Sequence, residues 1–97
     1  MAEPTGTLRL DKFLWFARIV KTRALAQAMA EAGRLRLNGR VVDKAHAIVR
    51  AGDVLSFARH GVVRVLRVEA LPARRRPAAE ARALYSDLPT VPASKSG

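Results

Sequence analysis

The sequence contains no cysteine, which excludes a disulfide framework, a thiolate zinc site and a cysteine nucleophile. No apolar run approaches the roughly 20 residues that a membrane-spanning helix needs, so we expect a soluble protein. Residues 1–7 lack the basic start and the apolar stretch of a signal peptide. We therefore expect no export and a cytoplasmic location.

Acidic residues are scarce. Eight Asp and Glu face 18 Lys and Arg, which gives a net charge of +10 in 97 residues. This length allows one domain with a single small core, and because 18 residues are alanine the core has few large side chains. Seventeen of the 18 cations are spread from Arg9 to Arg82 and are not confined to a tail. Positive charge on so small a body favours a polyanion as the partner.

The groups that an enzyme needs are also missing. The two histidines, His46 and His60, are 14 residues apart, and the chain has no glycine-rich phosphate loop and no paired carboxylates. We expect a loop position for His46 and a hairpin turn for His60, with neither imidazole acting as a ligand. Asp11 stands alone among cations, and we interpret it as a helix-start residue or as the partner of Arg18. We predict no catalytic activity, no metal and no cofactor.

Helical spacing begins after Leu8. One apolar stripe, made of Leu10, Phe13, Leu14 and Ala17, predicts a first helix with Trp15 pointing away from that stripe. Thr22 offers a hydroxyl cap to a second helix, and Gly33 supplies the left-handed residue that ends it. The expected apolar stripe of this helix is Leu25, Ala28, Met29 and Ala32, with Arg23 and Gln27 on the opposite face. Together the two helices predict a helix-turn-helix unit.

After Gly33 the spacing of the apolar residues changes to the one typical of strands. Asn38-Gly39 between two short apolar segments predicts a type I′ turn that joins Leu35–Leu37 to Arg40–Val42. Such a hairpin places Leu37 opposite Arg40 and mixes the two faces, so we expect it to be short and to end near Asp43. A turn at Ala51-Gly52-Asp53 precedes the next strands, which are Val54–Phe57 and Val62–Val68. We therefore expect three or four antiparallel strands.

The C-terminal part begins with a basic connector, 72–77, which contains Arg74, Arg75 and Arg76. Pro77 can then occupy the first position of a short helix with a weak apolar stripe of Ala81, Leu84, Tyr85 and Leu88. The predicted fold is α+β: a two-helix unit packed on a small antiparallel sheet, plus a short C-terminal helix. We divide the chain into a domain at 8–71, a connector and helix at 72–88, and flexible tails at 1–7 and 89–97.

The cations between Arg9 and Arg50 number ten against three acids. Five of them, Arg9, Lys12, Arg18, Lys21 and Arg23, belong to the two predicted helices or to the corner between them. The start of the second helix adds free backbone N–H groups and the positive end of the helix dipole, both of which favour phosphate. These features predict a converging basic surface.

Four motifs, in this order and at this spacing, resemble the RNA-binding domain first named for ribosomal small-subunit protein four: Arg9-Leu10-Asp11-Lys12-Phe13-Leu14, Lys21-Thr22-Arg23-Ala24, Gly33-Arg34-Leu35-Arg36-Leu37-Asn38-Gly39 and Ala51-Gly52-Asp53-Val54-Leu55. The resemblance covers about residues 8 to 57. Leu14-Trp15, and Arg75-Arg76-Pro77-Ala78-Ala79-Glu80-Ala81 leading to Leu84-Tyr85, are similar to the stand-alone, ribosome-associated heat-shock protein of fifteen kilodaltons. That family commonly continues into a longer lysine-rich extension, whereas the residues after Tyr85 here include one lysine, Lys95.

The resemblance implies binding to ribosomal RNA of the free large subunit that still carries a nascent chain on tRNA, in recycling, rescue or the heat-shock response. A related implied role is quality control of stalled chains. The implied RNA face comprises helix residues Arg9, Lys12, Arg18, Lys21, Thr22, Arg23 and Gln27, and hairpin residues Arg36, Asn38, Gly39, Arg40 and Lys44. No membrane partner is implied, and we expect a monomer.

Two alternatives remain at this stage. A DNA-binding helix-turn-helix regulator would suit two short helices and a high positive charge, with Arg23, Gln27 and Glu31 as base readers on the second helix. Structured RNA, which is recognised by shape and phosphate, suits the sequence better. For Trp15 the alternatives are stacking on an exposed base and packing under the C-terminal helix with Tyr85 or Leu84.

Overall fold

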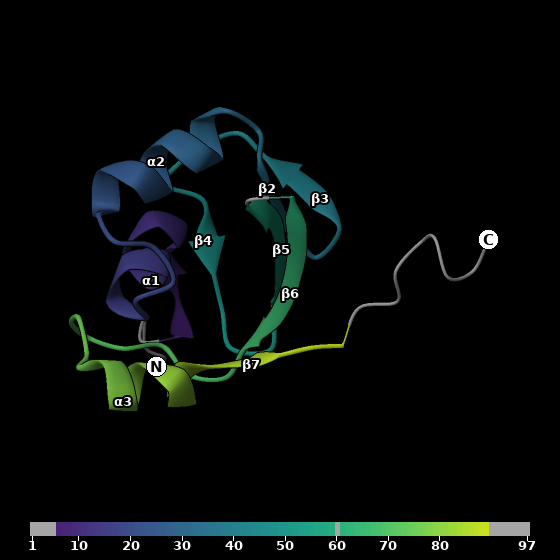
Figure 1. Ribbon diagram of the computed structural model, residues 1–97. Coiled ribbons are helices and arrows are strands. Elements are labelled where there is room, and N and C mark those ends of the chain that lie inside the picture. The colour runs from purple at the N-terminus through teal and green to yellow at the C-terminus, as the bar shows by residue number, and fades with distance from the viewer. Residues whose placement is uncertain (1–5, 60, 90–97) are drawn as a thin grey trace.

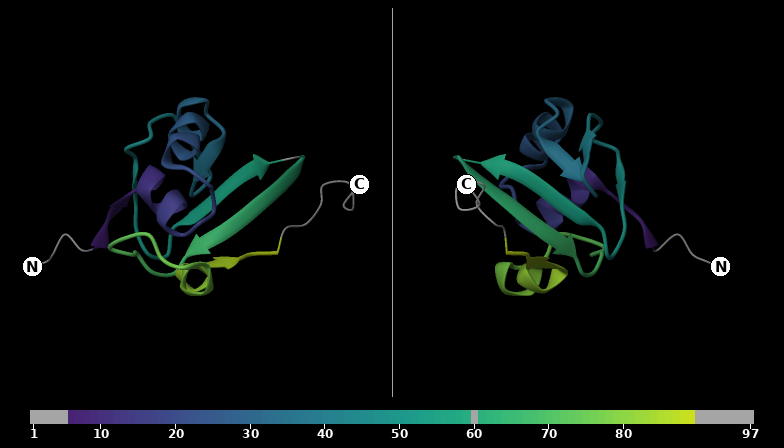
Figure 2. Two further views of the ribbon diagram at one scale, coloured as in Figure 1. Left: turned by 60° about the vertical axis from the view of Figure 1, so that its left-hand side comes forward. Right: turned by 90° about the vertical axis from the view of Figure 1, so that its right-hand side faces the viewer.

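The computed structural model describes residues 6–59 and 61–89, and it confirms an α+β fold. Helix α1 (Leu10–Phe16) packs against helix α2 (Arg23–Glu31), and the pair lies on one side of the sheet, as Figure 1 and Figure 2 show. Within the described residues no helix has the length and apolar character to cross a membrane. The predicted turn at His60 and most of the predicted tails lie outside the described residues.

The main sheet has five strands where three or four were expected, and every neighbouring pair is antiparallel. In spatial order the strands are β3 (Arg40–Val42), β2 (Leu35–Leu37), β5 (Val54–Arg59), β6 (Val62–Val68) and β7 (Tyr85–Asp87). A second, two-stranded sheet pairs β1 (Leu8–Arg9) with β4 (Ile48–Val49). Strands as short as β1 and β4 show no alternation of polar and apolar residues, so the sequence did not predict them.

The predicted C-terminal helix is confirmed only for α3 (Ala78–Ala81), which a 3-10 turn (Arg82–Leu84) follows. The expectation that Tyr85 and Leu88 continue a helical stripe was wrong, because the chain instead pairs with the free edge of β6. Tyr85 lies opposite Val68, and the backbone N–H of Leu88 donates to the carbonyl of Val65 at 2.8 Å. Pairing with an open sheet edge satisfies backbone groups that a weak helix would leave to water.

Both predicted ends of α2 are confirmed. The hydroxyl of Thr22 accepts the N–H of Leu25 at 3.0 Å, and Gly33 has a φ of +71°. The predicted apolar stripe of α2 needs correction. The buried residues are Ala26, Met29 and Ala30, Leu25 is half-buried, and Ala28 and Ala32 are exposed. Alternating alanines present similar small side chains all round the helix, so hydrophobicity alone does not fix its buried face.

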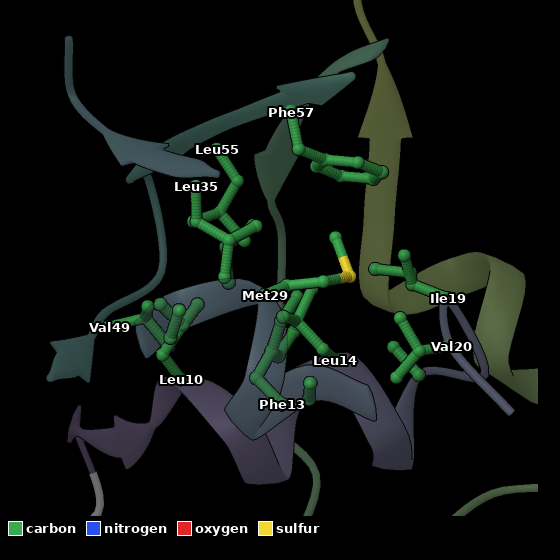
Figure 3. Packing of buried hydrophobic residues seen from close by; sticks show 14 of the residues in the cluster. Leu10, Phe13, Leu14, Ile19, Val20, Met29, Leu35, Val49, Leu55 and Phe57 are labelled. Atoms are coloured by element: carbon green, nitrogen blue, oxygen red, sulfur yellow. The ribbon is translucent and has the colours of Figure 1, made fainter. Parts of the chain in front are cut away.

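The core lies between the helix pair and the inner face of the sheet (Figure 3). Leu10, Phe13 and Leu14 of α1 are fully buried, as predicted, and they face Leu35 and Leu55 of the sheet. Complete burial of one such side chain contributes about 1.5–3 kcal/mol. This packing fixes the position of α1 relative to the sheet, and therefore the position of the polar residues on its first turn.

The predicted β2–β3 hairpin is confirmed together with its register. Leu37 lies opposite Arg40, and pairing ends with Leu35 opposite Val42. Asn38 has a φ of +52° and Gly39 a φ of +86°. Positive φ at both central residues is the requirement of a type I′ turn.

We expect Gly39→Val to lower the melting temperature clearly, because a β-branched side chain is strained at this φ even though a Cβ there would meet no atom within 4 Å. Gly39→Asn is the matched control, since Asn tolerates the left-handed region, and we expect it to lose less than half as much. Thermal unfolding followed by circular dichroism measures both. Equal losses in the two variants would show that the turn is not sensitive to φ at this position.

Candidate nucleic-acid interface

A buried carboxylate organises the polar residues of the two helices. Asp11 lies in the first turn of α1 and is fully buried. It accepts two hydrogen bonds from the guanidinium of Arg9 at 3.0 and 3.1 Å, and one from Arg23 Nε at 3.2 Å. Gln27 Nε2 donates at 3.1 Å, and the backbone N–H of Lys12 donates at 2.8 Å. One side chain thereby joins β1, α1 and α2.

The hydrogen bonds decide the ionisation of this carboxylate. Burial alone would raise the pKa of Asp11, but hydrogen bonds from Gln27, Arg9 and Arg23 outweigh it and hold the pKa below the ordinary value of 3.8. Asp11 is therefore ionised at neutral pH. Its negative charge compensates part of the charge of two arginines while fixing their orientation.

Arg9 and Arg23 are fixed but remain accessible. Their side chains are 40% and 36% exposed, so each guanidinium is held on one side and open to solvent on the other. The expectation that Arg23 and Gln27 lie on the face opposite the core was wrong, because both turn toward Asp11. Two guanidinium groups held in fixed directions provide a preorganised contact for phosphate.

Of the two interpretations of Asp11, the helix-start residue is confirmed by its place in the first turn of α1, and the pairing with Arg18 was wrong. Arg18 has a φ of +58° just after α1, and its Nε donates to the carbonyl of Arg76 in the connector at 2.6 Å. The connector is further attached by the backbone N–H of Arg76, which donates to the carbonyl of Phe16 at 3.2 Å. Arg18, a predicted RNA contact, thus holds the connector against α1.

Trp15 contacts the same connector. The guanidinium of Arg75 is 5.4 Å from the centre of the Trp15 ring, and its Nε donates to the Trp15 carbonyl at 3.3 Å. The ring is half-buried and packs against the core. Packing therefore describes Trp15 better than exposure for base stacking, with Arg75 as a partner where Tyr85 or Leu84 was expected.

The hairpin residues of the predicted face fall into two groups. The side-chain amide of Asn38 is hydrogen-bonded within the protein: its Nδ2 donates to Asp53 at 3.1 Å, and its Oδ1 accepts the N–H of Val54 at 2.9 Å. This amide joins the Asn38-Gly39 turn to the turn at Gly52. Arg36 and Arg40, in contrast, are exposed and have no ion pair within the part of the chain that the structure describes.

Lys44 lies in the segment between β3 and β4, which contacts the first turn of α1. The N–H of Leu10 donates to the carbonyl of Ala47 at 2.7 Å, and the N–H of Asp11 donates to the carbonyl of Ala45 at 3.3 Å. The residue next to Lys44 is thereby attached to the first turn of α1. The structure brings Lys44 toward the cluster around Asp11, although no ion pair between described residues links the hairpin side chains directly to that cluster.

Among residues 6–59 and 61–89, the predicted cations whose side chains make neither a hydrogen bond nor an ion pair are Lys12, Lys21, Arg36, Arg40 and Lys44. Sequence reasoning left out Arg34, which is exposed and equally unpartnered. Arg34 and Arg36 both border a hollow of about 190 Å³. The spacing of two residues in a strand-like segment could have revealed this pair. We define the free-cation set as Lys12, Lys21, Arg34, Arg36, Arg40 and Lys44.

Comparisons with known proteins agree with this geometry. The S4 domain model matches residues 8–55, which include Asp11, its partners and the hairpin. Heat shock protein 15 of Escherichia coli strain K12 is 41% identical over 85 residues. The trimeric structure of Vibrio cholerae heat shock protein 15 superimposes with a TM-score of 0.79 at 35% identity, covering 84% of this chain and 82% of that chain. The chain belongs to the heat shock protein 15 family.

The extent of these matches differs between relatives. The Escherichia coli heat shock protein 15 match covers 88% of this chain, which spans 63% of the length of that relative. A protein named RQC P-site tRNA stabilizing factor, from Halalkalibacterium halodurans, is 48% identical over 48 residues, which are 50% of this chain and 53% of that protein. Both the predicted family and the predicted S4-type domain are therefore confirmed.

We expect Asp11→Asn to destabilise this member of the heat shock protein 15 family, because the amide directs N–H groups at the donors of Arg9 and Gln27. A loss of about 1–3 kcal/mol corresponds to a melting temperature lower by roughly 5 to 20 °C. Asp87→Asn is the matched control, since that carboxylate is exposed and, among the described residues, pairs with Arg64 alone. Equal melting temperatures for the two variants would contradict the role of Asp11.

A comparison of Asp11→Asn with the wild type also tests how the stability contribution of Asp11 depends on pH. Because the folded pKa of Asp11 lies below its unfolded value, its contribution is complete at neutral pH and is lost as the pH falls below about 4. We expect the difference in melting temperature between the wild type and Asp11→Asn to shrink between pH 5 and pH 2. A difference that stays constant over this range would show that ionisation of Asp11 is not responsible.

Proposed function

We propose that this protein binds structured RNA of the large ribosomal subunit and makes no chemical change to it. The observation that carries the proposal is the arrangement around Asp11, where the guanidinium groups of Arg9 and Arg23 are held in place with 40% and 36% of their side chains exposed. In the proposal, the free-cation set on and beside the β2–β3 hairpin belongs to the same RNA-binding surface. Cations that lack acidic partners are available to phosphate oxygens, which supply most of the affinity for nucleic acid.

The geometry favours RNA over the DNA alternative. Of the three expected base readers on α2, Arg23 and Gln27 donate to Asp11, and Glu31 is the one whose side chain has no hydrogen bond or ion pair among the described residues. A carboxylate alone gives little sequence readout and repels phosphate. Contacts through a few fixed cations suit recognition of RNA by shape and backbone.

The family supports a more specific role, in which the protein binds the free large subunit that carries a nascent chain on tRNA and assists its recycling or rescue. The name of the related factor, RQC P-site tRNA stabilizing factor, points to the same kind of complex. Peptidyl-tRNA is then a neighbouring partner, and the protein acts in the cytoplasm. The expectation of a monomer stays a prediction, whereas the Vibrio cholerae relative is described as trimeric.

Sedimentation of cell lysate through a sucrose gradient tests this role. We expect the protein to migrate with free large subunits and not with small subunits or chromosomal DNA. A parallel titration at about 0.15 M salt compares large-subunit RNA with duplex DNA of equal length, because at low salt both would bind through charge alone. Stronger binding to duplex DNA, or migration away from ribosomes, would contradict the proposal.

We further expect single substitutions in the free-cation set to reduce the salt dependence of RNA binding. Arg36→Ala, Arg40→Ala and Lys44→Ala should each lower the log–log slope by roughly 0.7–0.9, because each removes one phosphate contact. Arg82→Ala is the matched control, since Arg82 is an exposed cation on the 3-10 turn after α3, outside the proposed surface.

Filter binding at several salt concentrations measures the slope, and circular dichroism confirms that each variant is folded. If Arg82→Ala changes the slope as much as the hairpin variants do, the binding depends on net charge and not on the proposed surface.

A further inference from the structure

A hollow of about 300 Å³ lies between α1 and the connector, apart from the Asp11 cluster. One side is formed by Lys12 and Phe16 of α1, and the other by Leu71, Pro72 and Ala73, with Leu8 also on its lining. The volume is enough for one nucleobase with part of its sugar. None of the functions discussed above uses this hollow except through Lys12, which also belongs to the free-cation set.

The connector wall of the hollow is held in place. Arg76, three residues after Ala73, is fastened to the end of α1: its N–H donates to the Phe16 carbonyl, and its carbonyl accepts from Arg18 Nε. Arg75 adds a contact with the Trp15 ring and a hydrogen bond to its carbonyl. Leu71 packs against the hydrophobic core at the other end of the wall. The hollow is therefore bounded by anchored segments and does not depend on a free loop.

The lining combines two kinds of chemistry. Phe16 offers a half-buried aromatic ring, and Leu71 and Pro72 add apolar surface. Lys12 offers an ammonium group with no acidic partner among the described residues. A simple anion would gain nothing from the apolar walls, and an apolar peptide would gain nothing from the ammonium group. A nucleotide has both a flat, partly apolar base and an adjacent phosphate.

We propose that this hollow accepts one unpaired nucleotide of the bound RNA, with the base against Phe16 and the phosphate beside Lys12. The inference rests on the proposed RNA-binding function and adds to it a preference for RNA with an extruded base. Stacking on an aromatic side chain tolerates any base. The site therefore selects a distortion of the RNA helix and not a sequence.

Two RNA hairpins with the same stem provide the test, one fully paired and one with a single bulged adenosine. We expect the full chain to bind the bulged hairpin roughly tenfold more tightly. Ala73→Trp fills the hollow from an exposed position, so it should remove this preference while leaving affinity for the paired hairpin within twofold. Ala79→Trp, at an exposed position of α3 outside the hollow, is the matched control and should retain the preference.

A second variant tests the ring itself. Phe16→Leu keeps an apolar side chain but removes the flat surface, and a 2-aminopurine placed at the bulge reports stacking by a loss of fluorescence. We expect quenching with the wild type and with Ala79→Trp, and little quenching with Phe16→Leu or Ala73→Trp. Circular dichroism and binding of the paired hairpin identify any variant that fails to fold.

The outcomes separate the two proposals. Equal affinity of the wild type for the two hairpins, or a preference that survives in Ala73→Trp, would overturn the nucleotide site and leave the proposed function intact. If the wild type binds neither hairpin at physiological salt, the proposed function fails, and the nucleotide site fails with it.

Discussion

The buried carboxylate of Asp11 is the interaction on which the arrangement of the helices depends. Moving a carboxylate out of water costs several kcal/mol, and only a full set of donors offsets that cost. The donors come from β1, α1 and α2, and they meet only when the two helices pack at one relative position. The buried face of α2, formed by Ala26, Met29 and Ala30, has mostly small side chains that would allow the helix to slide or rotate, whereas the directional bonds of Arg23 and Gln27 do not.

Cations in this protein therefore have two different roles, which net charge does not distinguish. Arg9 and Arg23 are held by Asp11, and Arg18 holds the connector. Arginine suits these positions because its planar guanidinium can donate to a protein acceptor and still present N–H groups to phosphate. The lysines at 12, 21 and 44 make no such bonds within the described residues. The positions with structural bonds are thus arginines, and the three lysines have no such bonds among the described residues.

Sequence reasoning succeeded where the deciding interaction is local. The Asn38-Gly39 pair fixes the turn and its register, and the Thr22 and Gly33 signals fix both ends of α2. It failed where partners are distant. The role of Asp11 depends on Gln27, 16 residues away, and β7 forms because β6 offers a free edge. The face of α2 was misplaced because alanines carry little hydrophobic contrast. The predicted site residues stay predictions, but the structure separates those whose side chains are bonded within the protein from those that are unpartnered among the described residues.

The unpartnered cations also connect stability with binding. Six of them lie on α1, at the α1–α2 corner, just before and within the β2–β3 hairpin, and in the segment after it, and like charges held on a compact body repel one another. This repulsion destabilises the folded state, because the unfolded chain spreads the same charges more widely. A polyanion that contacts several of these cations removes the repulsion and stabilises the folded form in proportion to its affinity. The hydrogen bonds around Asp11 join β1, α1 and α2 without a ligand, so the free cations can remain unneutralised until a polyanion binds.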